Sequence, residues 1–148
     1  MSRKRAACIV LKDNCILLMY RNNNGSEYYA YIGGGVEDGE SPEDAVVRET
    51  YEESSIHITV SKLLYSVKRR NGEVHYFYLC DYVEGYPEVQ KGTNEFADNQ
   101  TGQNIHIPKW VRITELPSLT IYPDVIADRI LKDIDEGLKI ENISIETE

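Results

Sequence analysis

The stretch from Gly34 to Ile56, which reads GGVEDGESPEDAVVRETYEESSI, decides the fold and carries most of the chemistry of this chain. It joins a glycine-rich turn to a predicted helix that carries Arg48, Glu49, Glu52 and Glu53. Residues three and four apart are neighbours on a helix, so Glu49 faces the other two glutamates, and each like-charge pair costs about 0.2–0.5 kcal/mol. The repulsion between these carboxylates indicates that the helix face binds a positively charged partner.

Carboxylate oxygens are the preferred ligands of hard divalent cations, and Mg²⁺ is usually held by a few carboxylates together with water and substrate phosphates. The helix begins with favourable residues, because Ser41 can cap it and Pro42 suits the first helical position. Arg48 can hold the Glu52 carboxylate through a pair four residues apart. These features predict a Mg²⁺ or Mn²⁺ site on the helix.

The same stretch matches the motif G-x5-E-x7-R-E-U-x-E-E-x-G-U, in which U is a bulky apolar residue. The matching residues are Gly34, Glu40, Arg48, Glu49, Glu52, Glu53 and Ile56. The chain therefore resembles the Nudix, or MutT-like, hydrolases. It departs from the motif at Thr50, which replaces an apolar residue, and at Ser55, which replaces the last glycine. Glycine at a helix end adopts a left-handed conformation at low steric cost, so Ser55 is expected to be strained or to end the helix differently.

The resemblance implies a metal-dependent hydrolase in which Mg²⁺ or Mn²⁺ orients a diphosphate and activates water. Its catalytic residues carry over onto Arg48, Glu49, Glu52 and Glu53. Glu52 and Glu53 are the firmest expected metal ligands. Glu49 is either a ligand or the general base, since both roles need an ionised carboxylate near water. The sequence leaves that choice open, together with the number of metal ions.

Further metal ligands are expected from outside the helix. In the resembled family a glycine carbonyl just before the helix contacts the metal, and here Gly33 or Gly34 would supply it. Another acidic residue commonly comes from a later loop, and Glu95 is the best placed by its order along the chain, with Asp98 and Glu115 as rivals. Long loops often carry function, but the glycines and asparagines around Glu95 are equally typical of a solvated surface excursion.

Candidate substrate-binding residues are aromatic or basic. Tyr28 and Tyr31 could stack on a nucleobase, a contact worth about 1–3 kcal/mol, although packing within a sheet is the commoner role of tyrosine. Arg69 and Arg70 precede the turn Asn71-Gly72 and could meet phosphate oxygens. A solvated hairpin tip explains the same two residues more simply, because arginine is mostly exposed.

Length and composition limit the architecture and the partners. A chain of 148 residues has the length of one domain, so we expect a single domain over residues 1–148, with 138–148 as a tail or an extra edge strand. Its formal net charge of −9 opposes binding to long nucleic acids. No stretch is apolar enough to span a membrane, so a cytoplasmic location is expected. Cys8, Cys15 and Cys80 have no metal-binding spacing and are expected to pack as small apolar residues.

Sequence patterns around the motif predict a mixed sheet with two helices. Strands are expected at 5–11, 15–20, 28–32, 62–70, 73–83 and 109–113, a long polar stretch at 84–104, and an amphipathic helix at 123–136. The bare pattern favours a two-layer α+β fold. Resemblance to the Nudix fold implies the α/β class and an α/β/α sandwich with a mixed β-sheet.

The leading functional hypothesis is a Mg²⁺-dependent pyrophosphohydrolase that cleaves a nucleoside diphosphate linked to another group, with oxidised nucleoside triphosphates, ADP-ribose and nucleotide sugars as substrates of the resembled family. One alternative is a pyrophosphohydrolase acting on RNA 5′ ends, which the negative net charge makes less attractive. Another is a nonenzymatic nucleotide-binding module, which has less need of the intact glutamate cluster. The expected partner is a small phosphorylated nucleotide, and the resemblance is compatible with a homodimer.

Overall fold

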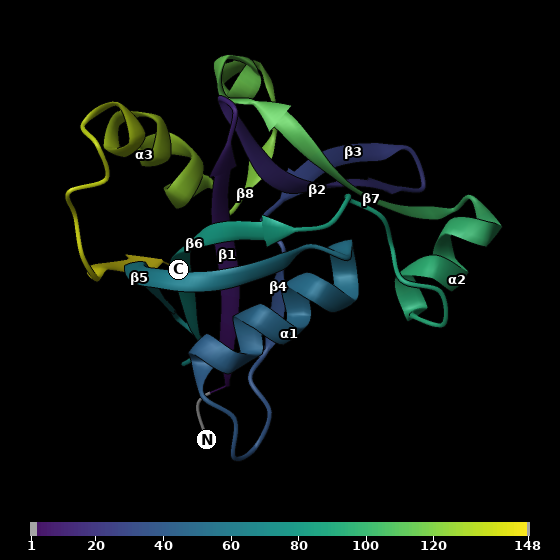
Figure 1. Ribbon diagram of the computed structural model, residues 1–148, viewed down its shortest axis with the longest axis horizontal. Helices are drawn as coiled ribbons and strands as arrows, with labels where there is room; N and C mark the ends of the chain where they lie inside the picture. The colour runs from purple at the N-terminus through teal and green to yellow at the C-terminus, as the bar shows by residue number, and fades with distance from the viewer. Residues whose placement is uncertain (1–2, 148) are drawn as a thin grey trace.

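The computed structural model describes residues 3–147, which form strands and helices around one curled sheet (Figure 1). The strands are β1 (Lys4–Lys12), β2 (Cys15–Asn23), β3 (Ser26–Ala30), β4 (Gly33–Gly35), β5 (His57–Arg69), β6 (Val74–Glu84), β7 (Asn104–Arg112), β8 (Ile121–Tyr122) and β9 (Ile143–Thr147). The helices are α1 (Pro42–Ser54), α2 (Asn94–Thr101), the 3-10 helix η1 (Ile113–Ser118) and α3 (Asp124–Asp135).

The sheet is mixed, and strand β1 stands at its centre. Its order is β8-β3-β2-β1-β6-β5-β9, with β4 paired to β1 and β7 paired to β2. Strand β1 runs parallel to β6 and antiparallel to β2 and β4, and the outer strand β9 runs parallel to β5. Residues far apart in the sequence therefore meet on neighbouring strands.

Two separate cores lie on opposite faces of the sheet. Ala45 and Val46 of α1 are buried on one face, while Ile126 and Ile130 of α3 are buried on the other. In Figure 1 the two helices accordingly lie on opposite sides of β5 and β6. Full burial of such a side chain contributes about 1.5–3 kcal/mol relative to exposure. The expected α/β/α sandwich with a mixed sheet is confirmed.

Several elements differ from the sequence prediction. The glycine run is itself a strand, β4, because Ala6 lies opposite Gly34 in an antiparallel pair with β1. The stretch 84–104, expected to be polar and without regular structure, contains helix α2. Strand β5 begins at His57 rather than at residue 62, and β7 begins at Asn104 rather than at 109.

The C-terminal tail forms an edge strand rather than a frayed end. Ile143 and Ile145 of β9 pair with Tyr65 and Val67 of β5, and they pack against the core beneath α3. Residue 148 lies outside the described residues. The alternating isoleucines of the tail therefore reflect a strand with one face on the core.

No helix among residues 3–147 is long and apolar enough to cross a membrane.

Candidate active site

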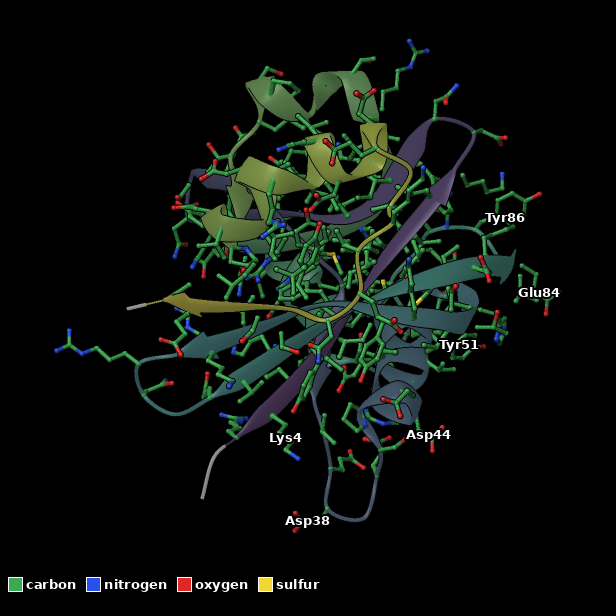
Figure 2. The ribbon with its side chains drawn as sticks, turned by 90° about the vertical axis from the view of Figure 1, so that its left-hand side faces the viewer. Lys4, Asp38, Asp44, Tyr51, Glu84 and Tyr86 are labelled. Carbon is green, nitrogen blue, oxygen red and sulfur yellow. The ribbon has the colours of Figure 1, made fainter. Side chains whose placement is uncertain are left out.

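Helix α1 begins with the cap predicted from the sequence. The Ser41 hydroxyl accepts a hydrogen bond from the Asp44 backbone N–H at 3.1 Å, and Pro42 occupies the first turn. The preceding loop extends away from the sheet, with Asp38 near its tip (Figure 2). The side chains that follow Pro42 on one face of α1 are thereby held against strand β4.

The end of α1 explains the serine that replaces a glycine in the motif. Ser55 is left-handed, with φ of 66°, and its N–H donates to the Tyr51 carbonyl at 2.8 Å. Its hydroxyl donates to the Glu88 carbonyl at 2.8 Å and accepts from Gln90 Nε2 at 2.7 Å. The backbone strain of a non-glycine residue, about 1–2 kcal/mol, is therefore accompanied by two bonds that a glycine could not make. Ser55 is both strained and part of the connection to the segment before α2.

Arg48 is the centre of the charge cluster. Its Nε and Nη2 donate to the two carboxylate oxygens of Glu40 at 2.8 and 2.9 Å, and its Nη1 donates to Glu49 at 3.0 Å and to Glu52 at 3.3 Å. This bidentate pair lowers the pKa of Glu40 to about 2. Glu40 also accepts from the Glu37 N–H at 3.1 Å, so it supports the loop through hydrogen bonds.

The glycine turn fits closely around the helix carboxylates. Glu53 Oε2 accepts a hydrogen bond from the Gly33 N–H at 3.1 Å. A Cβ atom at Gly34 would overlap the Glu49 carboxylate, and one at Gly33 would overlap the backbone of β1. A side chain is excluded at Gly33 by the backbone of β1, and one at Gly34 would displace the Glu49 carboxylate, so the two glycines let the strand approach Glu49 and Glu53 directly.

Glu53 is the most perturbed carboxyl group of the cluster. Burial, followed by the nearby charges of Glu49 and Glu95, raises the pKa of Glu53 to about 8. Burial also raises the pKa of Glu49, while Arg48 opposes that rise. A cation placed among these groups would favour their ionised forms, because an opposite charge lowers a carboxyl pKa. The electrostatics of the cluster thus fit a divalent metal.

Glu95 is brought towards the cluster by helix α2, whereas its rivals are placed otherwise. Its charge acts on Glu53 and on His106 of β7, so it lies within electrostatic reach of both. Asp98 accepts a hydrogen bond from Asn104 at 3.4 Å, and Glu115 is exposed on η1. Of the three loop candidates, Glu95 is the one that the structure associates with Glu53.

The expected metal ligands are not arranged as a ready-made coordination site. Among residues 3–147, no three acidic, histidine or cysteine side chains converge as metal ligands do. The geometry offers a reason, since Arg48 binds the Glu49 and Glu52 carboxylates itself. The donor set of Glu49, Glu52, Glu53, Glu95 and the backbone at Gly33 and Gly34 still has the oxygen chemistry that Mg²⁺ and Mn²⁺ prefer.

A cavity of about 510 Å³ lies next to the glycine turn, on the α3 side of the sheet. Tyr31 and Arg69, both proposed from sequence as substrate-binding residues, line it. Tyr28 and Arg70 do not: Tyr28 packs edge-on against Tyr122 at 5.5 Å between ring centroids, and Arg70 is exposed at the β5–β6 turn. The sequence-based assignments of Tyr28 and Arg70 are therefore not supported by the geometry.

Other residues of the cavity wall were not predicted from the sequence. These are chiefly Arg5, His75, Phe77, Tyr122 and Asp124. They come from β1, β6 and the β8–α3 junction, and only the strand register brings them together. No local sequence pattern indicates most of them. The exceptions are Arg5 and His75, which stand two positions before Ala7 and Phe77 and therefore share the inward face of their strands.

Comparison with known proteins places this arrangement in a family. The family model described as NUDIX domain matches residues 1–131. An ADP-ribose pyrophosphatase from Methanocaldococcus jannaschii is 41% identical over 100 residues, covering 61% of this chain and 58% of that protein. An NAD-capped RNA hydrolase NudC from Klebsiella pneumoniae subsp. pneumoniae is 30% identical over 134 residues, covering 86% of this chain and 47% of that protein.

The fold is shared with solved structures as well. A NUDIX hydrolase from Nitrosomonas europaea aligns with a TM-score of 0.73 and 16% identity, covering 99% of this chain and 80% of that chain. The chain spans about half the length of the curated relatives it matches. Since the family model covers most of the chain, from β1 into α3, this protein belongs to the NUDIX domain family.

Proposed function

We propose that this protein is a metal-dependent pyrophosphohydrolase that cleaves the diphosphate linkage of a nucleotide derivative. The observation that carries the proposal is the Arg48–glutamate cluster, which lies against the glycine turn that also borders the 510 Å³ cavity. A pure binding module has no need of several carboxylates held at one spot. One domain over residues 1–148, acting in the cytoplasm, would carry the whole site.

Glu49, Glu52 and Glu53 would hold the metal together with a carbonyl of Gly33 or Gly34, and Glu95 would complete the set from α2. A bound Mg²⁺ or Mn²⁺ supplies positive charge that neutralises the diphosphate and makes water more acidic. Arg48 keeps two of the glutamates in place through its bonds to Glu49 and Glu52. Its bidentate bond to Glu40 fixes the guanidinium in turn.

A general base must accept the proton of the attacking water. Glu49 and Glu95 are the candidates, because each is a carboxylate whose charge acts on Glu53, whereas burial raises the pKa of Glu53 itself to about 8. Glu49 has the Arg48 guanidinium at 3.0 Å, which favours its ionised form. We assign the role to Glu49 or Glu95 and leave Glu53 as a metal ligand.

The cavity favours a nucleotide over a simple inorganic diphosphate. It combines the rings of Tyr31, Phe77 and Tyr122 with the polar groups Arg69 and Asp124. Aromatic rings stack on nucleobases, and charged groups at the rim orient polar substituents. The names of the two relatives fit this chemistry, since ADP-ribose and an NAD cap both contain a nucleoside diphosphate.

Capped RNA is the second candidate substrate. The basic residues Arg5 and Arg69 beside the cavity favour it, whereas the net charge of −9 opposes a long contact with a polyanion. A homodimer is compatible with either substrate.

The test is a product screen with Mg²⁺ and with Mn²⁺. Candidate substrates are ADP-ribose, NAD, nucleotide sugars, normal and oxidised nucleoside triphosphates, and NAD-capped RNA, with products separated by mass. Cleavage between the two phosphates of one of these, abolished by chelation of the metal, is the expected result. Absence of cleavage across the set with both metals would refute the proposal.

A further inference from the structure

Three cationic or ionisable side chains form a row along one edge of the cavity. Arg5 of β1 lies opposite His75 of β6, and the Arg69 N–H of β5 donates to the Glu73 carbonyl, two residues from His75, at 2.8 Å. Side chains two apart on a strand face the same side. Because Phe77 belongs to the core beneath α3, His75 and its neighbours in the row face that side too. We call Arg5, His75 and Arg69 the cation row.

The strand ends that carry the row meet at one side of the molecule. Figure 2 shows Lys4 at the start of β1 on the same side as the β5–β6 hairpin and the tip of β9. The register agrees, since Lys4 lies opposite Val74 and Arg69 lies opposite Thr147. The row is therefore built from segments distant in sequence, and all three of its side chains border the cavity.

Among residues 3–147, the two arginines of the row lack acidic partners. Within residues 3–147, neither Arg5 nor Arg69 makes an ion pair within 4.0 Å, although the chain carries 25 acidic residues. The carboxylate that touches the row is Glu73, which binds His75 at 3.1 Å. Asp124 also borders the cavity. Two half-buried arginines on the strands either side of β6, in a strongly acidic protein, indicate a place for an anion.

A second observation concerns Tyr31, whose ring borders the same cavity. The residue is only 9% exposed, and its hydroxyl has no hydrogen-bond partner among residues 3–147. A buried polar group without a partner costs about 1–3 kcal/mol. A polar ligand in the cavity is one way to satisfy that hydroxyl, independently of the charges on Arg5 and Arg69.

The cavity connects the row to the proposed metal site. Gly33 and Gly34, which contact Glu53 and Glu49, line the same space as Arg5. The charge of Arg5 also acts on both glutamates. A substrate whose diphosphate meets those carboxylates can therefore place another part of the same molecule against the row.

We propose that Arg5, Arg69 and His75 form an anion subsite for a phosphate group of the substrate that is separate from the cleaved diphosphate. The inference rests on the proposed function and narrows its substrate class to nucleotides whose ribose carries a further phosphate. Guanidinium groups match phosphate oxygens in bidentate geometry. The phosphate is either a ribose monoester or the diester that leads to a second nucleotide.

Binding can be measured without catalysis. Calorimetric titrations would compare AMP with adenosine 2′,5′-bisphosphate for the monoester, and AMP with the dinucleotide pApA for the diester. For the wild-type protein we expect one of the two larger ligands to bind about tenfold more tightly than AMP. In Arg69→Gln and in Arg5→Gln that preference should fall to near unity. The ratio of the Kd of AMP to the Kd of the larger ligand, taken within each variant, corrects for any general loss of affinity.

Lys68→Gln is the matched control, because Lys68 is the exposed neighbour of Arg69 and does not line this cavity. It should retain the wild-type preference, and all variants should keep the wild-type melting temperature. Equal affinity of AMP and both larger ligands for the wild-type protein would overturn the inference. So would an undiminished preference in both arginine variants. Because no turnover is needed, a failed hydrolase assay alongside a clear preference would reject the proposed function and keep the subsite.

Discussion

Asn99 binds both backbone polar groups of His106. Its Oδ1 accepts from the His106 N–H at 2.6 Å, and its Nδ2 donates to the His106 carbonyl at 2.7 Å. This pair fastens α2 to β7. Glu95 lies one helical turn before Asn99 and therefore on the same face of α2, so these bonds help to hold Glu95 within reach of Glu53.

Substitution Asn99→Ala should accordingly act through Glu95. We expect roughly a tenfold loss of kcat/KM, because two hydrogen bonds worth about 0.5–1.5 kcal/mol each are removed. In the Glu95→Gln background, Asn99→Ala should lower kcat/KM little further, because the effects of two residues that act as one unit are not additive. Steady-state kinetics of the two single variants and the double variant measure this. Fully additive losses would show that Asn99 acts independently of Glu95.

Arg48→Lys should show that the shape of the guanidinium matters, not only its charge. Lysine keeps the charge but cannot make the bidentate bond to Glu40 while also reaching Glu49 and Glu52. Loss of residues that orient metal ligands commonly costs about 10–100-fold in activity or metal affinity. We expect a loss in that range for both the activity, measured by turnover, and the metal affinity, measured by Mn²⁺ titration. Wild-type values for both would remove Arg48 from this role.

Ser55 offers a test of the helix end. Ser55→Ala keeps the left-handed backbone strain and loses the two hydroxyl bonds to the 88–90 segment, whereas Ser55→Gly loses the same bonds but relieves the strain. Ser55→Ala should therefore be the less stable variant, by about 1 kcal/mol relative to Ser55→Gly. Thermal unfolding of the two proteins decides the order. Equal stabilities would mean that the left-handed residue carries no strain.

His75 makes the stability depend on pH. Burial, with the charges of Arg5 and Arg69, lowers its pKa, and Glu73 opposes this. The unfolded chain therefore binds the proton more readily, so the free energy of unfolding should fall as the pH drops below about 6.5. His75→Gln should lack this part of the decline. Denaturant unfolding of both proteins between neutral and mildly acidic pH measures the difference. Parallel curves would contradict the placement of His75 among these charges.

The sequence predicted the parts of the site that are local. The cap at Ser41, the Arg48–Glu52 pair and the glycines before α1 depend on residues within one or two helical turns, so spacing alone indicates them. The α/β/α layers followed from the resemblance alone, since the bare pattern favoured two layers. The amphipathic pattern of the late helix predicted the buried face of α3.

The rest of the site depends on contacts between strands that are distant in the sequence. Arg5 and His75 become neighbours only through the register of β1 and β6, and no pattern within either strand shows which strand lies beside it. Helix α2 has no buried residue to give it an amphipathic signal. Polar contacts with β7, including the two bonds between Asn99 and His106, hold it in place. The ring of Tyr28 packs on Tyr122 rather than lining the cavity, and the sequence does not distinguish the two, because an aromatic residue on a strand looks the same in either place.

The most direct test of the Arg48–glutamate cluster compares Mg²⁺-dependent cleavage of the best substrate by wild-type protein, Glu53→Gln and Asp44→Asn. Asp44, labelled in Figure 2, is the matched control because it is an exposed carboxylate on the same helix and, among residues 3–147, makes no ion pair with Arg48. We predict that Glu53→Gln loses at least about a hundredfold in kcat while remaining folded, and that Asp44→Asn keeps the wild-type rate. Wild-type turnover by folded Glu53→Gln would contradict the assignment of this cluster as the site of diphosphate cleavage.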